Sequence, residues 1–250
     1  MFHRWFPYRK PNAHTVLRLL CFPYDGGGAS IYRQWHDLLP SSIEVWAIQL
    51  PGRENRIGEE PLLQLSHFIK MTEEALFPFL EDGTPYAFFG HSMGALLSFE
   101  LTQALRKQGY PLPVYLFVSG RSAPQRPLRT KPTYNLPEDA FIEALKRLNG
   151  TPEEVLRHRE LLQLILPILR ADFQLCETYS YKECEPLPCS VMAFGGTQDV
   201  EVTHADLAAW ECQTREKFSM RMFDGDHFFL HKSGEQISRE ITRALFPFLW

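Results

Sequence analysis

Residues 86–109 read YAFFGHSMGALLSFELTQALRKQG, in which an apolar run, the pentapeptide GHSMG and a helical pattern follow one another. The apolar run suits a buried strand, and the leucines after it recur on one helix face up to Gly109, a residue that ends helices. A G-x-S-x-G turn between strand and helix is a strained elbow, whose glycines let the backbone bend so that the serine hydroxyl stands clear. The stretch therefore predicts that Ser92 is a nucleophile. The alternative is an idle serine in a tight turn.

Outside this stretch the chain alternates between short apolar runs and helical patterns. Such alternation predicts an α/β fold with a mainly parallel sheet, helices on both faces, and ligand sites at the carboxyl ends of the strands. At 250 residues the chain fits a single domain over residues 1–250. The expected strands are 16–22, 43–49, 86–89, 115–119, 190–194 and 219–223, and the expected helices between them are 31–39, 62–80, 93–108, 204–210 and 235–248.

The interval between strands 115–119 and 190–194 is too long for one crossover and predicts an insertion. Its first part, residues 121–136, is proline-rich and basic, and helical periodicity follows over 137–148 and 152–173. Because the insertion emerges at the edge where ligands bind, we interpret it as a helical lid. Extra helical padding is the alternative.

Composition excludes several function classes. The net charge of −4 comes without a concentrated basic face, which argues against a nucleic-acid partner. One local basic run, containing Arg121, Arg126, Arg129 and Lys131, is typical of a solvated loop. The amino-terminal residues lack the apolar core of a signal peptide and no apolar run is long enough to span a membrane, so we expect a cytoplasmic protein without membrane association. The five cysteines form no C-x-x-C pair, so we expect neither a disulfide framework nor a zinc site. The serine chemistry described below needs no metal and no cofactor.

A serine nucleophile needs a base to take its proton and an acid to orient that base. In this fold the chain order is serine, acid, histidine. Asp199 follows strand 190–194 through a Gly-Gly turn, and His227 follows strand 219–223 through an Asp-Gly-Asp turn. We therefore predict a triad of Ser92, Asp199 and His227. Alternatives for the base are His231, His91 and His204, and alternatives for the acid are Glu201, Asp224 and Asp226.

An oxyanion hole requires two backbone N–H groups. One is expected from Met93, directly after the nucleophile, and the other from the loop after the first core strand, residues 22–29 (FPYDGGGA). The Asp25 amide is the preferred second donor and Gly26 the next. The glycine triplet could instead cradle a phosphate, but no G-K-[ST] follows it.

Several motifs together resemble the type II thioesterases that accompany nonribosomal peptide and polyketide synthases, within the α/β-hydrolase superfamily. The resemblance spans nearly the whole chain. It implies hydrolysis of acyl thioesters on the phosphopantetheine arm of an acyl or peptidyl carrier protein, which removes stalled acyl groups, and a lid at residues 121–185. The motifs are CFPY with the glycine triplet at 21–28, LPGRE at 50–54, FFGHSMGA at 88–95, LPILRADF at 166–173, ETY at 177–179, Gly195-Gly196 with Asp199, and GDHF at 225–228.

Two departures from the family pattern matter. Asp25 stands where a small apolar residue is more usual, which leaves the amide but adds a carboxylate near the oxyanion. Asp226 precedes His227 where glycine is common, so Asp226 is a second candidate for the acid of the triad. A carboxylesterase or lipase acting on oxygen esters is the alternative activity, and a binding module without catalysis is the alternative class.

Overall fold

A computed structural model describes residues 2–80, 82–127, 131–148, 150 and 153–250. Its centre is one sheet of six parallel strands in the order β2-β1-β3-β4-β5-β6. All six strands expected from the sequence are confirmed, with ends that move by one or two residues. The strands are β1 (Leu17–Phe22), β2 (Ile43–Ala47), β3 (Tyr86–His91), β4 (Tyr115–Ser119), β5 (Ser190–Gly196) and β6 (Phe218–Phe223).

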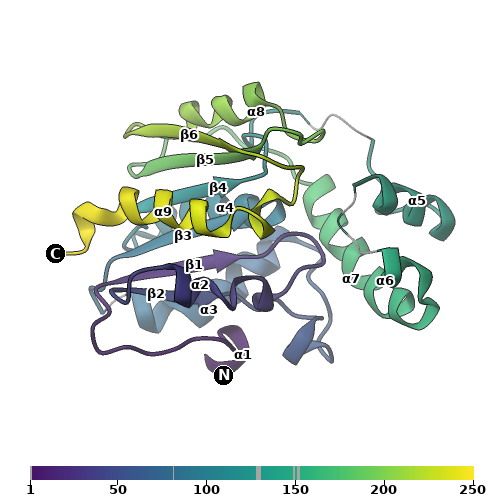
Figure 1. The fold of residues 1–250 in the computed structure, drawn as a ribbon, viewed down its shortest axis with the longest axis horizontal. Helices are drawn as coiled ribbons and strands as arrows, with labels where there is room; N and C mark the ends of the chain where they lie inside the picture. The colour runs from purple at the N-terminus through teal and green to yellow at the C-terminus, as the bar shows by residue number, and fades with distance from the viewer. Residues whose placement is uncertain (1, 81, 128–130, 149, 151–152) are drawn as a thin grey trace.

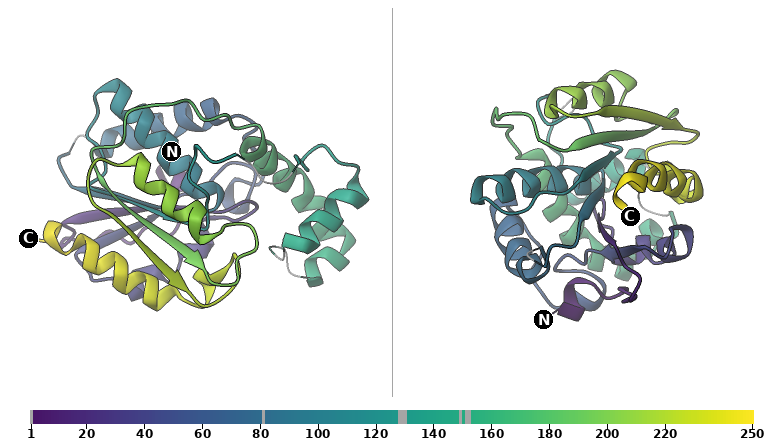
Figure 2. Two further views of the ribbon diagram at one scale, coloured as in Figure 1. Left: turned by 90° about the horizontal axis from the view of Figure 1, so that it is seen from above. Right: turned by 90° about the vertical axis from the view of Figure 1, so that its left-hand side faces the viewer.

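Helices cover both faces of this sheet, as the right-hand view of Figure 2 shows. On one face lie α3 (Leu65–Leu80) and α4 (Met93–Gln108), and on the other α2 (Trp35–Leu38) and α9 (Gly234–Leu245). The short helix α8 (His204–Ala208) packs on the side of α3 and α4. The strands are apolar throughout because side chains on both of their faces are buried.

Several helices differ from their expected ranges. Segment 31–39 forms a 3-10 turn (Ala29–Tyr32) followed by α2, which ends at Leu38 because Leu39 precedes a proline and is extended. Segment 152–173 is two helices, α6 (Glu153–Arg157) and α7 (Arg159–Glu177), separated by extended backbone at His158; Pro152 lies outside the described residues. The expected helices 204–210 and 235–248 each end in a 3-10 turn. A short helix, α1 (Phe2–Trp5), was not expected.

The helices of the insertion lie together at one end of the molecule. Figure 1 shows α5 (Glu138–Leu148), α6 and α7 on the right, beyond the sheet, and Figure 2 shows the same group from above. Helices α5 and α7 share a small apolar core of their own, separate from the two cores of the sheet: Phe141, Leu145, Leu162, Leu166 and Leu169. None of the helices among the described residues is long and apolar enough to cross a membrane.

Candidate active site

The elbow between β3 and α4 holds Ser92 in a strained conformation. Its φ is 53° and its ψ is −114°, in a region that non-glycine residues rarely adopt. The surrounding backbone leaves no room for side chains at the two motif glycines, since a Cβ on Gly90 would lie 2.1 Å from the Gly94 carbonyl oxygen and one on Gly94 2.1 Å from that of Phe22. Strain of this kind persists only where packing enforces it, and it is typical of functional sites.

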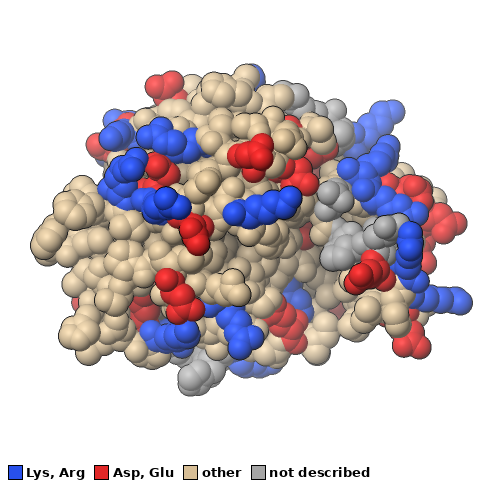
Figure 3. Space-filling model, in the orientation of Figure 1, with Lys and Arg blue, Asp and Glu red and all other residues tan. Residues whose placement is uncertain are grey.

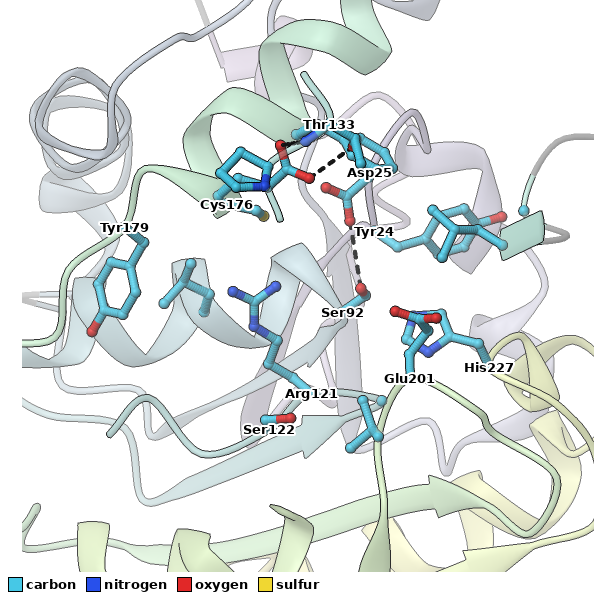
Figure 4. Close-up of a pocket in the computed structure, with 18 of the residues that line it drawn as sticks. Tyr24, Asp25, Ser92, Arg121, Ser122, Thr133, Cys176, Tyr179, Glu201 and His227 are labelled. Carbon is cyan, nitrogen blue, oxygen red and sulfur yellow. Dashed lines mark hydrogen bonds between the residues drawn. The ribbon is translucent and has the colours of Figure 1, made fainter. Parts of the chain in front are cut away.

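Ser92 opens into a cavity of about 870 Å³ between the sheet edge and the insertion. Loop residues from the carboxyl ends of several strands line one part of it, including Asp25, Glu201 and His227, and Arg121 follows β4 on the same wall. Figure 4 shows Arg121 and Cys176 on one side of Ser92 and His227 with Glu201 on the other. The insertion contributes mainly apolar side chains: Leu136, Ala144, Leu145, Leu148, Leu169 and Phe173.

The structure brings Asp199 and His227 together. His227 Nδ1 lies 2.8 Å from Asp199 Oδ2, and the Asp199 side chain is fully buried. The other carboxylate oxygen accepts hydrogen bonds from the backbone N–H groups of Glu201 and Val202, at 2.8 and 3.1 Å. These bonds fix the carboxylate, which in turn fixes the imidazole so that Nε2 is the nitrogen left for a proton transfer.

The alternative histidines have other surroundings. His91 is completely buried with Nδ1 2.8 Å from Ser119 Oγ, and burial lowers the pKa of its imidazole well below the usual value. His231 Nε2 lies 3.0 Å from the Tyr24 hydroxyl, and the exposed His204 begins α8.

The alternative acids likewise have other contacts. Exposed Asp224 accepts a hydrogen bond from Gln198, and exposed Asp226 accepts one from the Phe228 backbone N–H. Glu201 lines the cavity, and Figure 4 draws it on the same side of Ser92 as His227.

On its other side, Ser92 meets the carboxylate of Asp25. Ser92 Oγ donates to Asp25 Oδ2 across 3.4 Å, and the described residues contain no hydrogen bond between Ser92 and His227. Burial raises the pKa of Asp25, the nearby Asp172 carboxylate raises it further, and Arg121 lowers it by a smaller amount. A proton transfer to His227 would therefore require the hydroxyl hydrogen to turn away from Asp25.

A buried ion pair holds the loop that carries Asp25. Arg53 Nη1 and Nη2 donate to the two oxygens of Asp172 across 2.6 and 2.8 Å, and both side chains are at most 4% exposed. Asp172 Oδ2 also accepts from the Gly26 N–H at 2.7 Å, while Arg53 Nη1 donates to the Gly27 carbonyl at 3.2 Å. Gly26, the second choice for the oxyanion donor, is thus already engaged. Met93 begins α4, so its N–H is one of the helix-end donors that lack an intrahelical acceptor.

Three residues of this site were not singled out from the sequence. Arg53 and Asp172 lie in the LPGRE and LPILRADF stretches, which contributed to the resemblance but received no role. Arg121 was grouped with a solvated basic run, whereas its side chain points into the cavity. Of that run, Arg126 lies 3.6 Å from Asp206, and Arg129 falls outside the described residues.

Comparisons with known proteins place the chain in a family. The thioesterase domain family matches residues 17–245. The gramicidin S biosynthesis protein GrsT of Aneurinibacillus migulanus is 48% identical over 243 residues, which cover 97% of this chain and 94% of GrsT. Among solved structures, ClbQ from the colibactin NRPS/PKS pathway superimposes with a TM-score of 0.88 at 31% identity, covering 94% of this chain and 98% of ClbQ.

A second solved structure, the type II thioesterase BorB from the borrelidin biosynthetic cluster, has a TM-score of 0.84 at 34% identity and covers 98% of each chain. These matches span nearly the whole chain and confirm the α/β-hydrolase fold expected from the sequence. The chain therefore belongs to the thioesterase family and, within it, to the type II thioesterases of nonribosomal peptide and polyketide pathways.

Proposed function

We propose that this enzyme hydrolyses acyl thioesters on the phosphopantetheine arm of an acyl or peptidyl carrier protein, with Ser92, His227 and Asp199 as its catalytic triad. The observation that carries the proposal is the buried Asp199–His227 pair, which opens onto the same cavity as the strained Ser92. No other histidine near the elbow among the described residues is bonded to a carboxylate in this way.

The first half of the reaction transfers the acyl group to the enzyme. Ser92 Oγ attacks the thioester carbonyl carbon while His227 Nε2 accepts the hydroxyl proton, and Asp199 stabilises the imidazolium that forms. The negative charge on the carbonyl oxygen is met by the N–H groups of Met93 and Asp25. The carbon–sulfur bond then breaks, the imidazolium returns the proton to the departing sulfur, and the free pantetheine thiol leaves.

The second half repeats the same steps with water. His227 takes a proton from a water molecule, the resulting hydroxide attacks the acyl carbon, and the bond to Ser92 Oγ breaks. The serine recovers its proton from the imidazolium, and the acyl group leaves as a carboxylic acid. In both halves of the reaction, His227 accepts the proton and then returns it.

Residues 121–185 act in this proposal as a lid within a single domain of 1–250. The position of α5, α6 and α7 beyond the strand ends and the apolar wall that α5 and α7 give the cavity support this role. The carrier, a cytoplasmic partner, would approach beside these helices. Figure 3 shows Lys and Arg side chains there, mixed with Asp and Glu.

A substrate panel tests the proposal. The purified enzyme is given an acyl carrier protein thioester, the matching acyl-CoA and an oxygen ester with the same acyl group, and kcat/KM is compared. We expect the carrier thioester to be the best substrate and Ser92→Ala to abolish its turnover. A preference for the oxygen ester would instead identify a carboxylesterase.

A further inference from the structure

The side chain of Asp25 has no role in the reaction proposed above, which uses only its backbone N–H. Its carboxylate nevertheless points at the nucleophile, with Oδ2 3.4 Å from Ser92 Oγ, and lines the cavity that receives the acyl group. A negatively charged group at this place lies close to where the attacked carbonyl becomes negative. With a neutral acyl group it therefore opposes the reaction, because like charges repel.

The Asp25 carboxylate also lacks an ionic partner, unlike its neighbour. In the described part of the chain no cation lies within ion-pair distance of it, whereas Asp172 is paired with Arg53 through two hydrogen bonds. Arg121 is near enough to lower the pKa of Asp25 slightly, but burial has the larger, opposite effect. Hydrogen bonds from a backbone N–H and the Cys176 thiol stabilise the ionised form by smaller amounts than burial destabilises it. A carboxylate removed from water without a cation beside it is costly to the fold, and a ligand cation would offset that cost.

The position of Asp25 specifies where such a cation would lie on the substrate. An ammonium group on the carbon next to the carbonyl is two bonds from the carbonyl carbon that Ser92 Oγ attacks. It therefore falls within reach of a carboxylate that contacts Ser92 Oγ. We infer that Asp25 is a specificity residue that selects aminoacyl thioesters, which carry a protonated amine next to the carbonyl, over neutral acyl thioesters. This inference rests on the proposed function, and the bonds broken and formed are those described above.

The ammonium also changes the electrostatics of the transition state. Once it pairs with Asp25, the carboxylate no longer opposes the negative oxygen. Glu201 is another carboxylate that lines the cavity, and Arg121, drawn on the other side of Ser92 in Figure 4, would repel an ammonium. We assign the amine to Asp25 because it is Asp25 that contacts the attacking oxygen.

Two thioesters of equal shape test the assignment. Alanyl-pantetheine and isobutyryl-pantetheine differ only in an ammonium group that replaces a methyl group, so the ratio of their kcat/KM values measures recognition of the charge. The ratio is determined at neutral pH for the parent, Asp25→Asn and Glu201→Gln, after subtraction of the non-enzymatic rate. Asparagine keeps the size of the side chain and the backbone N–H, and thermal melting verifies that each variant is folded.

We expect the parent to prefer the alanyl thioester, and Asp25→Asn to lower the alanyl-to-isobutyryl ratio about 10- to 100-fold, partly by turning over isobutyryl faster. Glu201→Gln should leave the ratio within about twofold of the parent. An unchanged ratio in Asp25→Asn, or the larger change in Glu201→Gln, overturns the inference. If the parent hydrolyses both thioesters equally, the inference fails while the proposed function stands. If it hydrolyses neither these nor carrier thioesters, both fail.

Discussion

The two sides of Ser92 are built differently. On one side, the loops after β5 and β6 bring Asp199 and His227 into a pair inside the protein, and both oxygens of the carboxylate have partners. On the other side, the loop after β1 presents the Asp25 carboxylate to the cavity, where it accepts from the Ser92 hydroxyl and lies beside the Cys176 thiol. A carboxylate that is paired within the protein orients a catalytic group, whereas one left open to the cavity is placed to meet a substrate. In our proposal the same residue type thus serves the reaction on one side and selection on the other.

The largest effect is expected at the residue that both sides share. Ser92→Ala should lower turnover of a carrier thioester by a factor on the order of 10⁴ or more, since nucleophile and base act as one unit. His227→Ala should cost about as much, and the double variant little more. Steady-state kinetics with a carrier thioester measure all three. Substantial activity in Ser92→Ala would show that Ser92 is not the nucleophile and that the proposed triad is wrong.

The paired side is tested by its carboxylate. Asp199→Asn should keep the fold but reduce kcat by roughly 10²- to 10⁴-fold, because an amide does not stabilise the imidazolium and favours the wrong tautomer. The matched control is Asp226→Asn, because Asp226 is an exposed acid next to His227. This variant should lower kcat far less. If the two effects came out reversed, Asp226 would be the orienting acid.

The side that carries Asp25 is tested through the ion pair that holds its loop. Asp172→Asn removes the charge and leaves one side-chain oxygen for the Gly26 N–H and the two Arg53 donors, so it should lower kcat about 10- to 100-fold by loosening the Asp25 N–H, with a smaller change in KM. The control is Glu44→Gln, which weakens a partly buried ion pair, Arg9–Glu44 at 2.6 Å, at the amino end of β2. Both variants should melt at lower temperature, but Glu44→Gln should keep kcat. Full activity in folded Asp172→Asn would show that the pair is structural only.

A smaller effect is expected at the rim of the cavity. Arg126→Ala combined with Lys131→Ala should raise KM for a carrier thioester a few-fold, more so at low salt, and leave a small pantetheine thioester unaffected. Alanine at Arg239 and Arg243 on α9 removes the same charge at a distance from the insertion and serves as the control. Equal changes in the two double variants would indicate a general charge effect and no docking at the rim.

The smallest effect concerns stability. Because burial raises the pKa of Asp25, its ionised form destabilises the folded protein at neutral pH, and Asp25→Asn should raise the melting temperature there. The gain should shrink as the pH falls through the pKa of Asp25 in the folded protein, and vanish below its unfolded value of about 3.9. Thermal melting across this range measures it. A variant less stable than the parent at neutral pH would mean that the carboxylate is satisfied within the protein.

The sequence predicted the features that depend on local pattern. The six strands and the elbow at Ser92 follow from apolar runs and glycine spacing, and parallel topology explains why Asp199 and His227 lie near each other. The pairing of Arg53 with Asp172 could not be predicted, because the two are 119 residues apart and no local pattern connects them. Arg121 was misjudged for a similar reason: a basic run does not reveal which of its side chains turns inward. The break at His158 is likewise invisible in a periodicity that continues on both sides.

Trapping the acyl-enzyme shows directly whether Ser92 is the nucleophile. The enzyme is mixed with a carrier protein that bears an isotopically labelled acyl group, quenched with acid within one turnover, and digested for mass spectrometry. The account predicts the label on the peptide that contains Ser92, with none in Ser92→Ala. Label on Cys176, the thiol next to Asp25 in the cavity, or steady hydrolysis without any labelled peptide would contradict it.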